Sequence, residues 1–420
     1  MAFAKPKGTN DFFGKQIAIW QHVEKTIREI CDDFGVTEIR TPMFETTDLF
    51  QRGVGETTDI VQKEMFTFQD QGGRSLTLRP EGTASAARAY IENGLYNEAQ
   101  PMKLYYISPT FRAERPQKGR YRQFHQFGVE IFGSYSPAAD AEMVSIAVHL
   151  VNRLGVKNTT LHINSLGNNE SRAAYNAALT AYIGDNLEKL CPTCRERFVK
   201  NPLRVLDCKV PDCKEIVAGA PRAVDSLLPE CKKHFDDFQA CLTEMGIPFV
   251  VDPGIVRGLD YYTRTVFEIV STDLGAQGTV CGGGRYDNLV AEVGGPQTGA
   301  TGFGLGLERL AILLEESGVL DLPPAAPVLY VGAMGEAGFL KAQAIVYKLR
   351  QSGVYAEADT VGRSVKAQFK YADKIGAKYA VMLGDNELAA GSVSIKRMET
   401  SEQEMITIDN IESYIKEKRA

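Results

Sequence analysis

The sequence predicts an α+β fold in which helices flank a largely antiparallel sheet, followed by a smaller α/β domain. Over the first 320 or so residues, strand-like and helical segments follow one another without the strict alternation of a parallel sheet. After a proline-rich stretch at 323–327, strand and helix patterns alternate regularly. The length of 420 residues also exceeds one domain of ordinary size, and a hydrophobic content of 44% is enough for a large core.

The first expected element is an amphipathic helix at 15–34. Its apolar residues, from Trp20 to Phe34, recur at steps of three and four, and Gly35 follows as a residue suited to end a helix. Strand-like segments come next, at 37–40, 75–78, 102–108, 124–132, 160–164 and 264–270. From Leu166 to about Pro248 the sequence becomes helical, charged and cysteine-containing, which indicates an insertion.

The proline-rich stretch marks a linker, because proline blocks helix formation and stiffens a connector. Beyond it we expect strands at 328–331, 354–358, 379–383, 392–398 and 405–408, with helices at 336–351, at 364–375 and at the C-terminus. The sequence therefore predicts one domain at 1–321, carrying the insertion at about 166–248, and a second domain at 325–420.

Composition narrows the function classes. The chain has 47 Lys and Arg residues against 53 Asp and Glu, a net charge of −6, which excludes a polybasic protein that holds nucleic acid by bulk charge. A local basic site is still compatible with this total. No apolar run approaches a membrane span, and the N-terminus lacks the apolar segment of a secretory signal. Eight cysteines are too few for a disulfide scaffold, so we expect a cytoplasmic protein with no membrane partner.

The common nucleotide-binding and hydrolase motifs are absent. The sequence contains no P-loop, no G-x-G-x-x-G at a strand-to-helix turn, no G-x-S-x-G elbow and no H-E-x-x-H. If the protein uses a nucleotide, it does so through another architecture.

Residues 111–122 form the most informative segment. Positions 112–122 hold five basic residues and one acid, a local charge of +4 in an acidic chain. Pro116 and Gly119 predict a loop, and 123–130 has the pattern of a returning strand. Guanidinium groups on such a hairpin suit phosphate binding, and the loop suits contact with a polyanion. A solvated basic hairpin is the structural alternative.

Two other arginines and a carboxylate stand in unusual surroundings. Arg309 lies at the start of an apolar helix after a glycine-rich strand. Burying its charge there costs free energy unless a phosphate or carboxylate pairs with it. Arg257 begins Arg-Gly-Leu-Asp-Tyr-Tyr at 257–262, which suits a pocket wall, with a polar turn as the alternative. Glu81 lies at an expected helix N-terminus, where capping is its structural alternative.

Together these segments resemble the motifs of the class II aminoacyl-tRNA synthetases. The interface motif of that class resembles 38–45, the second motif resembles 111–114 with the basic loop, and the third resembles 304–309. Two further peptides, 257–262 and Cys-Gly-Gly-Gly-Arg-Tyr-Asp at 281–287, resemble the signature peptides of the histidyl-tRNA synthetase family. The resemblance covers essentially the whole chain and implies a class II antiparallel sheet followed by an α/β anticodon-binding domain of class IIa.

The resemblance implies a ligase that activates L-histidine with ATP to histidyl-adenylate and transfers the histidyl group to the 3′ end of tRNA(His). It also implies Mg²⁺ arriving with ATP and, from the interface motif, a homodimer. The alternative is a synthetase-like regulatory subunit of the first enzyme of histidine biosynthesis. Such proteins lose the C-terminal module and parts of the signature peptides, and both are intact here.

By the same resemblance, three arginines are the catalytic residues. Arg112 holds the amino-acid carboxylate and the α-phosphate, Arg257 lies beside the α-phosphate, and Arg309 holds the γ-phosphate. Glu114 contacts the adenine side, so that ATP is bound by Arg112, Glu114 and Arg309. The residues expected to bind histidine are Glu81, Gly82, Thr83, Arg112, Gln126, Glu130, Arg257, Tyr261 and Tyr262.

Within that set the resemblance places Glu130 and Tyr262 at the imidazole ring, and Glu81, Thr83 and Gln126 at the α-amino group. His125 lies next to Gln126 in the sequence but is not assigned to the site. Strand alternation turns its side chain away from the face of Gln126 and Glu130. The basic loop at 115–122 is the expected contact for the tRNA acceptor stem. The lysines that recur every four residues at 366–378 are expected to be solvated surface.

No metal site is assigned from the sequence. Five cysteines nevertheless fall in one stretch: Cys191, Cys194, Cys208, Cys213 and Cys231. Cys191 and Cys194 have the spacing of a zinc knuckle, and either Cys208 with Cys213 or Cys231 with His234 completes the set. Inert buried thiols are the alternative.

Overall fold

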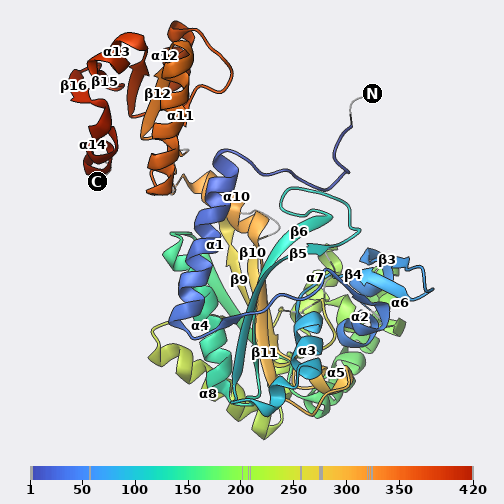
Figure 1. Ribbon diagram of the computed structural model, residues 1–420. Helices are drawn as coiled ribbons and strands as arrows, with labels where there is room; N and C mark the ends of the chain where they lie inside the picture. Colours follow the sequence, from blue (N-terminus) through green and yellow to red (C-terminus); the bar gives the residue numbers. More distant parts are fainter. Residues whose placement is uncertain are drawn as a thin grey trace. The chain divides into compact units, whose positions relative to one another are not determined.

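The computed structural model describes residues 3–55, 58–200, 202–206, 208, 210–255, 258–273, 278–318, 320, 322 and 325–418. The chain divides into two compact units, Met1–Leu322 and Pro323–Ala420 (Figure 1). Among the described residues, no helix is long and apolar enough to cross a membrane.

An eight-stranded sheet forms the centre of the first unit, in the order β1-β5-β6-β11-β10-β9-β7-β8. Its interior pairs are all antiparallel, and only the edge pairs β1–β5 and β7–β8 are parallel. The strands are β1 (Thr37–Glu38), β5 (Met102–Phe111), β6 (Gln123–Phe132), β7 (Thr159–Ser165), β8 (Val250–Val251), β9 (Thr263–Ser271), β10 (Thr279–Arg285) and β11 (Ala300–Gly306). The predicted fold class is confirmed.

Helices cover one face of this sheet. They are α1 (Lys15–Asp33), α4 (Pro137–Arg153), α8 (Pro229–Glu244) and α10 (Leu307–Ser317). Their apolar residues share one core with alternate residues of the central strands, such as Phe127 and Val129 of β6 and Phe303 of β11. Because side chains alternate along a strand, residues 126, 128, 130 and 132 of β6 face the other side of the sheet. The main core therefore supports one face and leaves the opposite face for a site.

The predicted first helix is confirmed, since α1 ends one residue before Phe34 and Gly35 has the positive φ of 63° that suits a residue just past a helix end. Helix α4 was not anticipated, although its sequence carries two start signals. The Ser136 hydroxyl accepts a hydrogen bond from the backbone N–H of Ala138, and Pro137 occupies the first turn.

The opposite face carries smaller elements. These are a three-stranded antiparallel sheet in the order β2-β4-β3 and the helices α2, α3 and α9. Their bounds are β2 (Phe44–Thr46), β3 (Phe66–Gln69), β4 (Ser75–Leu78), α2 (Thr47–Val54), α3 (Thr83–Glu92) and α9 (Leu289–Glu292). Residues from α3 and α9 pack with Tyr106, Phe132 and Tyr286 into a second core beside the large sheet.

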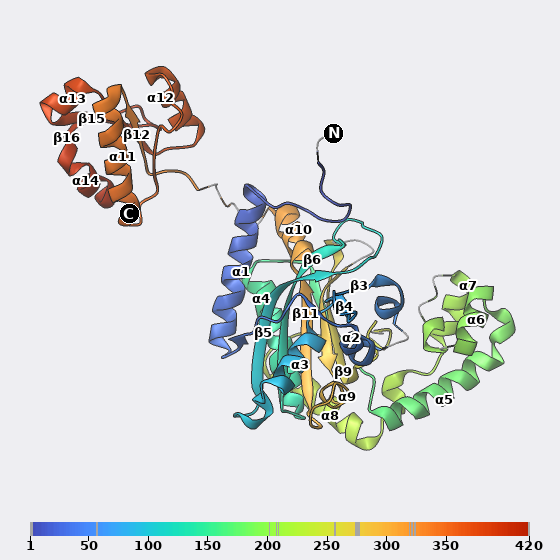
Figure 2. The same ribbon diagram turned by 45° about the vertical axis from the view of Figure 1, so that its right-hand side comes forward.

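Between β7 and β8 the chain is helical, as predicted. The helices are α5 (Asn169–Asp185), α6 (Pro192–Lys200), α7 (Pro211–Ala218) and α8. Figure 2 shows α5, α6 and α7 grouped together, and they enclose a small core of their own. Helix α8 differs, because its Phe235, Phe238 and Leu242 belong to the main core beneath the sheet.

The second unit is an α/β domain with a five-stranded sheet in the order β13-β12-β14-β15-β16. Strands β13, β12 and β14 are parallel, and β15 and β16 join antiparallel. The elements are β12 (Leu329–Ala333), α11 (Gly335–Gln351), β13 (Ala356–Ala358), α12 (Val365–Lys374), β14 (Tyr379–Leu383), α13 (Asp385–Ala390), β15 (Ser392–Arg397), β16 (Gln403–Thr407) and α14 (Ile411–Lys418). Of the lysines that recur every four residues at 366–378, Lys378 lies beyond α12, because the helix ends at Lys374.

Candidate active site

A cavity of about 810 Å³ opens on the face of the large sheet that α1 and α4 leave uncovered. Its walls come from β6, β9, β10 and β11, from the loop after β5, and from the α5–α7 insertion. Eight residues predicted to bind histidine or ATP line it: Glu81, Thr83, Arg112, Glu114, Gln126, Tyr261, Tyr262 and Arg309. Gly82 and Glu130 lie just behind the wall, and Arg257 is outside the described residues.

Glycines on β11 make room for the polar side chains of β6. A Cβ atom on Gly302 would lie 1.9 Å from Glu130 Oε2 and 2.6 Å from the carbonyl oxygen of Val129. A Cβ atom on Gly304 would lie 2.0 Å from Gln126 Nε2. The glycine-rich strand before Arg309 is therefore what allows the Gln126 and Glu130 side chains to lie across the sheet.

We expect Gly302→Ala to destabilise the protein, because the methyl group collides with a buried carboxylate and a backbone carbonyl. Overpacking of this kind costs about 1–3 kcal/mol. Gly306→Ala is the matched control, since a Cβ atom at Gly306 meets nothing within 4 Å. The free energy of unfolding in urea measures both, and equal values for the two variants would contradict this account of the strand.

The carboxylate of Glu130 is fully buried behind Thr83. Its Oε1 accepts hydrogen bonds from Thr83 Oγ1 at 2.9 Å and from the Tyr106 hydroxyl at 3.0 Å, and its Oε2 accepts one from the Tyr286 hydroxyl. Burial raises the pKa of Glu130 to about 8, although the hydroxyl donors oppose this rise. Three hydroxyls thus hold one carboxyl group just behind the wall of the cavity.

Glu81 caps the helix that begins at Thr83. Its carboxylate accepts hydrogen bonds from the backbone N–H groups of Thr83 (2.6 Å) and Ala84 (2.8 Å), so the structural alternative considered for this residue is realised. The carboxylate also lines the cavity. Next to it, the N–H of Gly82 donates to Gln126 Oε1 at 3.2 Å, which joins the start of α3 to β6.

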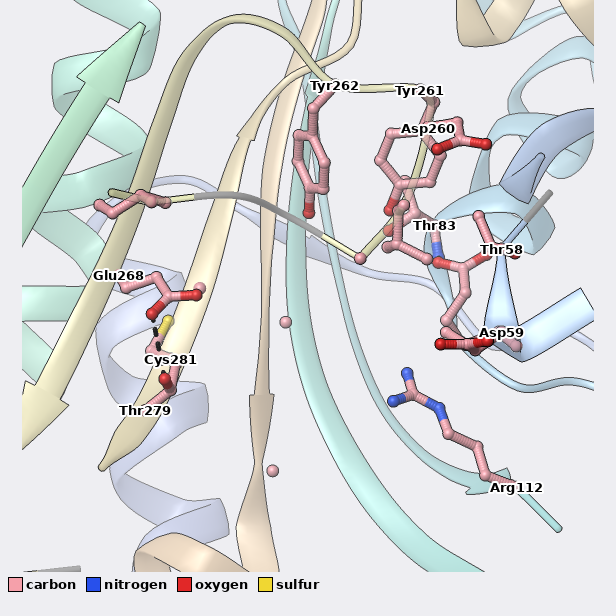
Figure 3. A pocket seen from close by; sticks show the side chains of 18 of the residues that line it. Thr58, Asp59, Thr83, Arg112, Asp260, Tyr261, Tyr262, Glu268, Thr279 and Cys281 are labelled. Atoms are coloured by element: carbon pink, nitrogen blue, oxygen red, sulfur yellow. Dashed lines mark hydrogen bonds between the residues drawn. The ribbon is translucent and has the colours of Figure 1, made fainter. Parts of the chain in front are cut away.

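Arg112 enters the cavity from the end of β5. Its Nε donates to the carbonyl oxygen of Pro80 at 2.9 Å, and its guanidinium lies 5.3 Å from the centre of the Phe124 ring. Burial lowers the pKa of Arg112, while Glu64, Glu114 and Glu81 favour its charged form. In Figure 3 the guanidinium points into the cavity from the side opposite Glu268 and Cys281.

Arg309 connects the basic loop to the sheet. Its Nε donates to the carbonyl oxygen of Gly119 at 3.2 Å, and one terminal nitrogen donates to that of Thr279 at 2.7 Å. The predicted loop is present, with Gln117 and Arg120 bridged at its tip. Arg120 also approaches Glu114 at 3.4 Å, so the loop's charge is partly balanced beside the cavity.

Tyr261 and Tyr262 close the other end of the cavity. Their ring centres are 4.7 Å apart, and Tyr261 contacts Tyr286 edge-on at 5.5 Å. In Figure 3 the tyrosine side chains and Thr83 border the cavity at the end away from Arg112. Tyr286 belongs to the peptide 281–287, whose Arg285 is fully buried and pairs with Asp140 at 2.7 Å and Asp287 at 3.0 Å. That peptide therefore supports the site from beneath.

His125 faces away from the cavity, as predicted from strand alternation. Its ring stacks edge-on against Trp20 of α1, and its Nδ1 lies 3.1 Å from Glu308 Oε1. The Glu308 carboxylate also accepts the backbone N–H of His125. Glu308 therefore ties α10 to β6.

Sequence reasoning missed several polar residues of the cavity, among them Glu268 and Arg172. Glu268 of β9 faces it and accepts a hydrogen bond from Thr279 Oγ1 at 3.0 Å. The sequence did contain a signal for Glu268, because this acidic residue lies between Val266 and Val270 on one face of a strand. Arg172 of α5 donates to the carbonyl oxygen of Tyr262, and nothing in the sequence of the insertion indicated this contact.

Comparison with known proteins decides the family. The family model for histidyl-tRNA synthetase matches residues 8–310, and the model for an anticodon-binding domain matches residues 328–418. The chain belongs to the histidyl-tRNA synthetase family. A histidine–tRNA ligase of Acetivibrio thermocellus is 52% identical over 411 residues, which cover 98% of this chain and 99% of the relative. The corresponding figures for a histidine–tRNA ligase of Clostridium botulinum are 51% over 417 residues, with 99% of each chain covered.

A solved structure of the family agrees with this fold. The crystal structure of the apo histidyl-tRNA synthetase of S. aureus is 38% identical and superposes with a TM-score of 0.84 over 99% of this chain and all of that chain. The resemblance noted from the motifs is therefore confirmed. The predicted class II sheet and anticodon-binding domain are those of the histidyl-tRNA synthetase family.

Proposed function

We infer that the protein is a histidine–tRNA ligase, which activates histidine with ATP and charges tRNA(His). One observation supports this most strongly. A single cavity brings Arg112 and Arg309 together with Glu81, Gln126 and the tyrosine pair, so that phosphate-binding and amino-acid-binding groups share one space. The regulatory-subunit alternative is not favoured, because relatives over nearly the whole length are named as ligases and the anticodon-binding domain is present.

The activation step needs positioning and charge rather than a general base. A carboxylate oxygen of histidine attacks the α-phosphorus of ATP, a new C–O–P linkage forms, and pyrophosphate leaves with the electron pair of the broken P–O bond. We propose that Arg112 orients the carboxylate and the α-phosphate and that Arg309 binds the γ-phosphate end. Both guanidiniums are already held by backbone carbonyls, so little reorganisation accompanies the reaction.

For the remaining ATP-side residues we propose the roles implied by the motifs, with Glu114 near the adenine and Arg257 beside the α-phosphate. In the transfer step the 3′-terminal hydroxyl of the tRNA attacks the histidyl carbonyl and AMP leaves. Gly119, Arg120 and Tyr121 of the basic loop line the cavity, which supports contact with an RNA end there.

Histidine recognition needs acceptors for the ammonium group and for the ring. We propose Glu81, Thr83 and Gln126 for the ammonium group, and Tyr262 and Glu130 for the ring, with Tyr261 lining the pocket. The wall formed by Glu81, Thr83 and Gln126 supports the first assignment, and the buried Glu130 carboxyl supports the second. An amino acid without ring N–H groups has no such proton to donate at this end of the cavity, so it forms fewer hydrogen bonds there than histidine.

We propose Mg²⁺ as the companion of ATP. Magnesium prefers oxygen ligands and is commonly held by one or two carboxylates together with phosphate oxygens. Glu268 fits this requirement, since its carboxylate lines the cavity near Thr279 and on the same wall as the Arg309 contact. Bound there, the ion would offset charge on the triphosphate.

We also propose a cytoplasmic homodimer. The cysteines support a reducing compartment, since none of the eight forms a disulfide. An apolar patch on the small sheet, at and beside the interface motif, supports a second copy as partner. It consists of Met43, Phe44 and Phe68, which are 53%, 49% and 43% exposed.

A charging assay tests the proposed function. With ATP, Mg²⁺, labelled histidine and tRNA(His), the protein should form histidyl-tRNA(His). Formation of histidyl-adenylate without charging would restrict the function to activation, and neither product would favour a regulatory role.

A further inference from the structure

Four cysteines of the insertion converge at a point outside the catalytic cavity. The sulfur atoms of Cys191, Cys194, Cys208 and Cys213 all lie within 4.8 Å of one another, and none forms a disulfide. The Cys191 and Cys208 sulfurs are 3.9 Å apart. Zinc–sulfur bonds of about 2.3 Å in a tetrahedron separate the sulfurs by about 3.8 Å, so the spacing matches one mononuclear ion.

Two helix starts bring these sulfurs together. Cys191 precedes α6, and Cys194 lies in its first turn, with the N–H of Cys194 donating to the carbonyl oxygen of Cys191 at 2.9 Å. Cys213 lies in the first turn of α7, and its sulfur accepts the N–H of Cys191 at 3.3 Å. The starts of α6 and α7 therefore place the Cys191, Cys194 and Cys213 sulfurs close together.

The core around the cluster is small. It consists of Tyr175, Leu179, Ile183, Leu190, Val205 and Ala223 together with Cys194, Cys208 and Cys213. A hydrophobic core of this size gives little stability by itself, and small domains commonly add a metal or a disulfide. The cysteines are thus built into the part of the insertion that most needs a cross-link.

Cys231 and His234, the other pair that the sequence offered as metal ligands, lie elsewhere in the fold. The His234 Nε2 is 3.4 Å from Asp140 beneath the large sheet, and the Cys231 sulfur lies 3.9 Å from Glu230. Neither residue belongs to the cluster of four. The structure therefore selects Cys208 and Cys213 from the alternatives that the spacing left open.

We propose that Cys191, Cys194, Cys208 and Cys213 bind one Zn²⁺ ion as thiolates and that this ion is structural. All four positions of a tetrahedral zinc are filled by protein ligands, which is the pattern of structural rather than catalytic sites. Binding releases the thiol protons and couples metal affinity to folding of the insertion. The ion would also fix α6 and the turn after it, which present Arg197 and Leu206 to the catalytic cavity.

Metal analysis of the full-length protein tests the proposal. Protein prepared under reducing conditions, without added chelator, should contain about one zinc per chain by elemental mass spectrometry. Cys194→Ser and Cys213→Ser should each lose most of it. Cys241→Ser is the matched control, because Cys241 is a free cysteine outside the cluster and should leave the zinc content unchanged.

A second measurement uses the wild-type protein, so that it does not depend on the folding of the cysteine variants. Wild-type protein stripped with a chelator and reconstituted with Co²⁺ alone should show the intense absorption of a tetrahedral cobalt thiolate. Stripped protein should also be cleaved by protease within residues 186–219 faster than the zinc-loaded protein. Wild-type protein with under about a tenth of an equivalent of zinc, a stoichiometric iron content instead, or full zinc in Cys194→Ser would each overturn the proposal.

Discussion

Arg112→Ala should slow the formation of histidyl-adenylate about 10²- to 10³-fold, the loss typical for removal of one preorganised electrostatic group. The side chain occupies the cavity between the start of α3 and the returning strand β6. Its Nε is bound to the carbonyl oxygen of Pro80, which directs the rest of the guanidinium towards the cavity. We expect the loss in the chemical step, because the charge that we propose Arg112 stabilises develops as the carboxylate attacks the α-phosphorus.

Single-turnover adenylation, measured by rapid quench, separates this effect from binding. Arg112→Lys should recover only part of the rate, since lysine keeps the charge but lacks the planar fork that binds two oxygens at once. Arg153→Ala is the control arginine, because Arg153 pairs with Glu29 and Asp33 on the surface away from the cavity. An unchanged rate in Arg112→Ala would remove Arg112 from the mechanism.

Removal of residues 323–420 should reduce charging of tRNA(His) about 10²-fold or more while leaving adenylation near its original rate. The second unit has its own sheet and its own core, and every residue of the cavity belongs to the first unit. Loss of one of two linked binding modules commonly weakens overall affinity by about 10²- to 10⁴-fold. The measurement is charging at limiting tRNA compared with adenylate formation in the same preparation.

Two results would contradict that expectation. Full charging by the truncated protein would exclude an anticodon role for the second unit. Parallel loss of adenylation and charging, in a truncated protein that still melts cooperatively, would show that the second unit contributes to the catalytic cavity itself.

Local patterns in the sequence predicted much of this fold. Alternation along β6 placed Gln126 and Glu130 on one face and His125 on the other, and the structure confirms both. The steps of three and four in α1 likewise predicted its buried face. Such patterns can be predicted from the sequence because they depend only on residues that are close together in it.

Contacts between distant segments could not be predicted in this way. The hydroxyls of Tyr106 and Tyr286 that hold Glu130 come from residues 24 and 156 positions away in the sequence. Arg172 reaches Tyr262 from the insertion, 90 residues distant. The choice between the Cys208–Cys213 pair and the Cys231–His234 pair as partners of Cys191 and Cys194 also depended on how α7 and α8 pack.

The central claim is that this cavity activates histidine. ATP–pyrophosphate exchange, run with each of the twenty amino acids in turn on the full-length protein, tests it most directly. We expect exchange that depends on histidine, with the other amino acids near background. Exchange that depends on proline or threonine would contradict it. So would the absence of exchange with every amino acid tested.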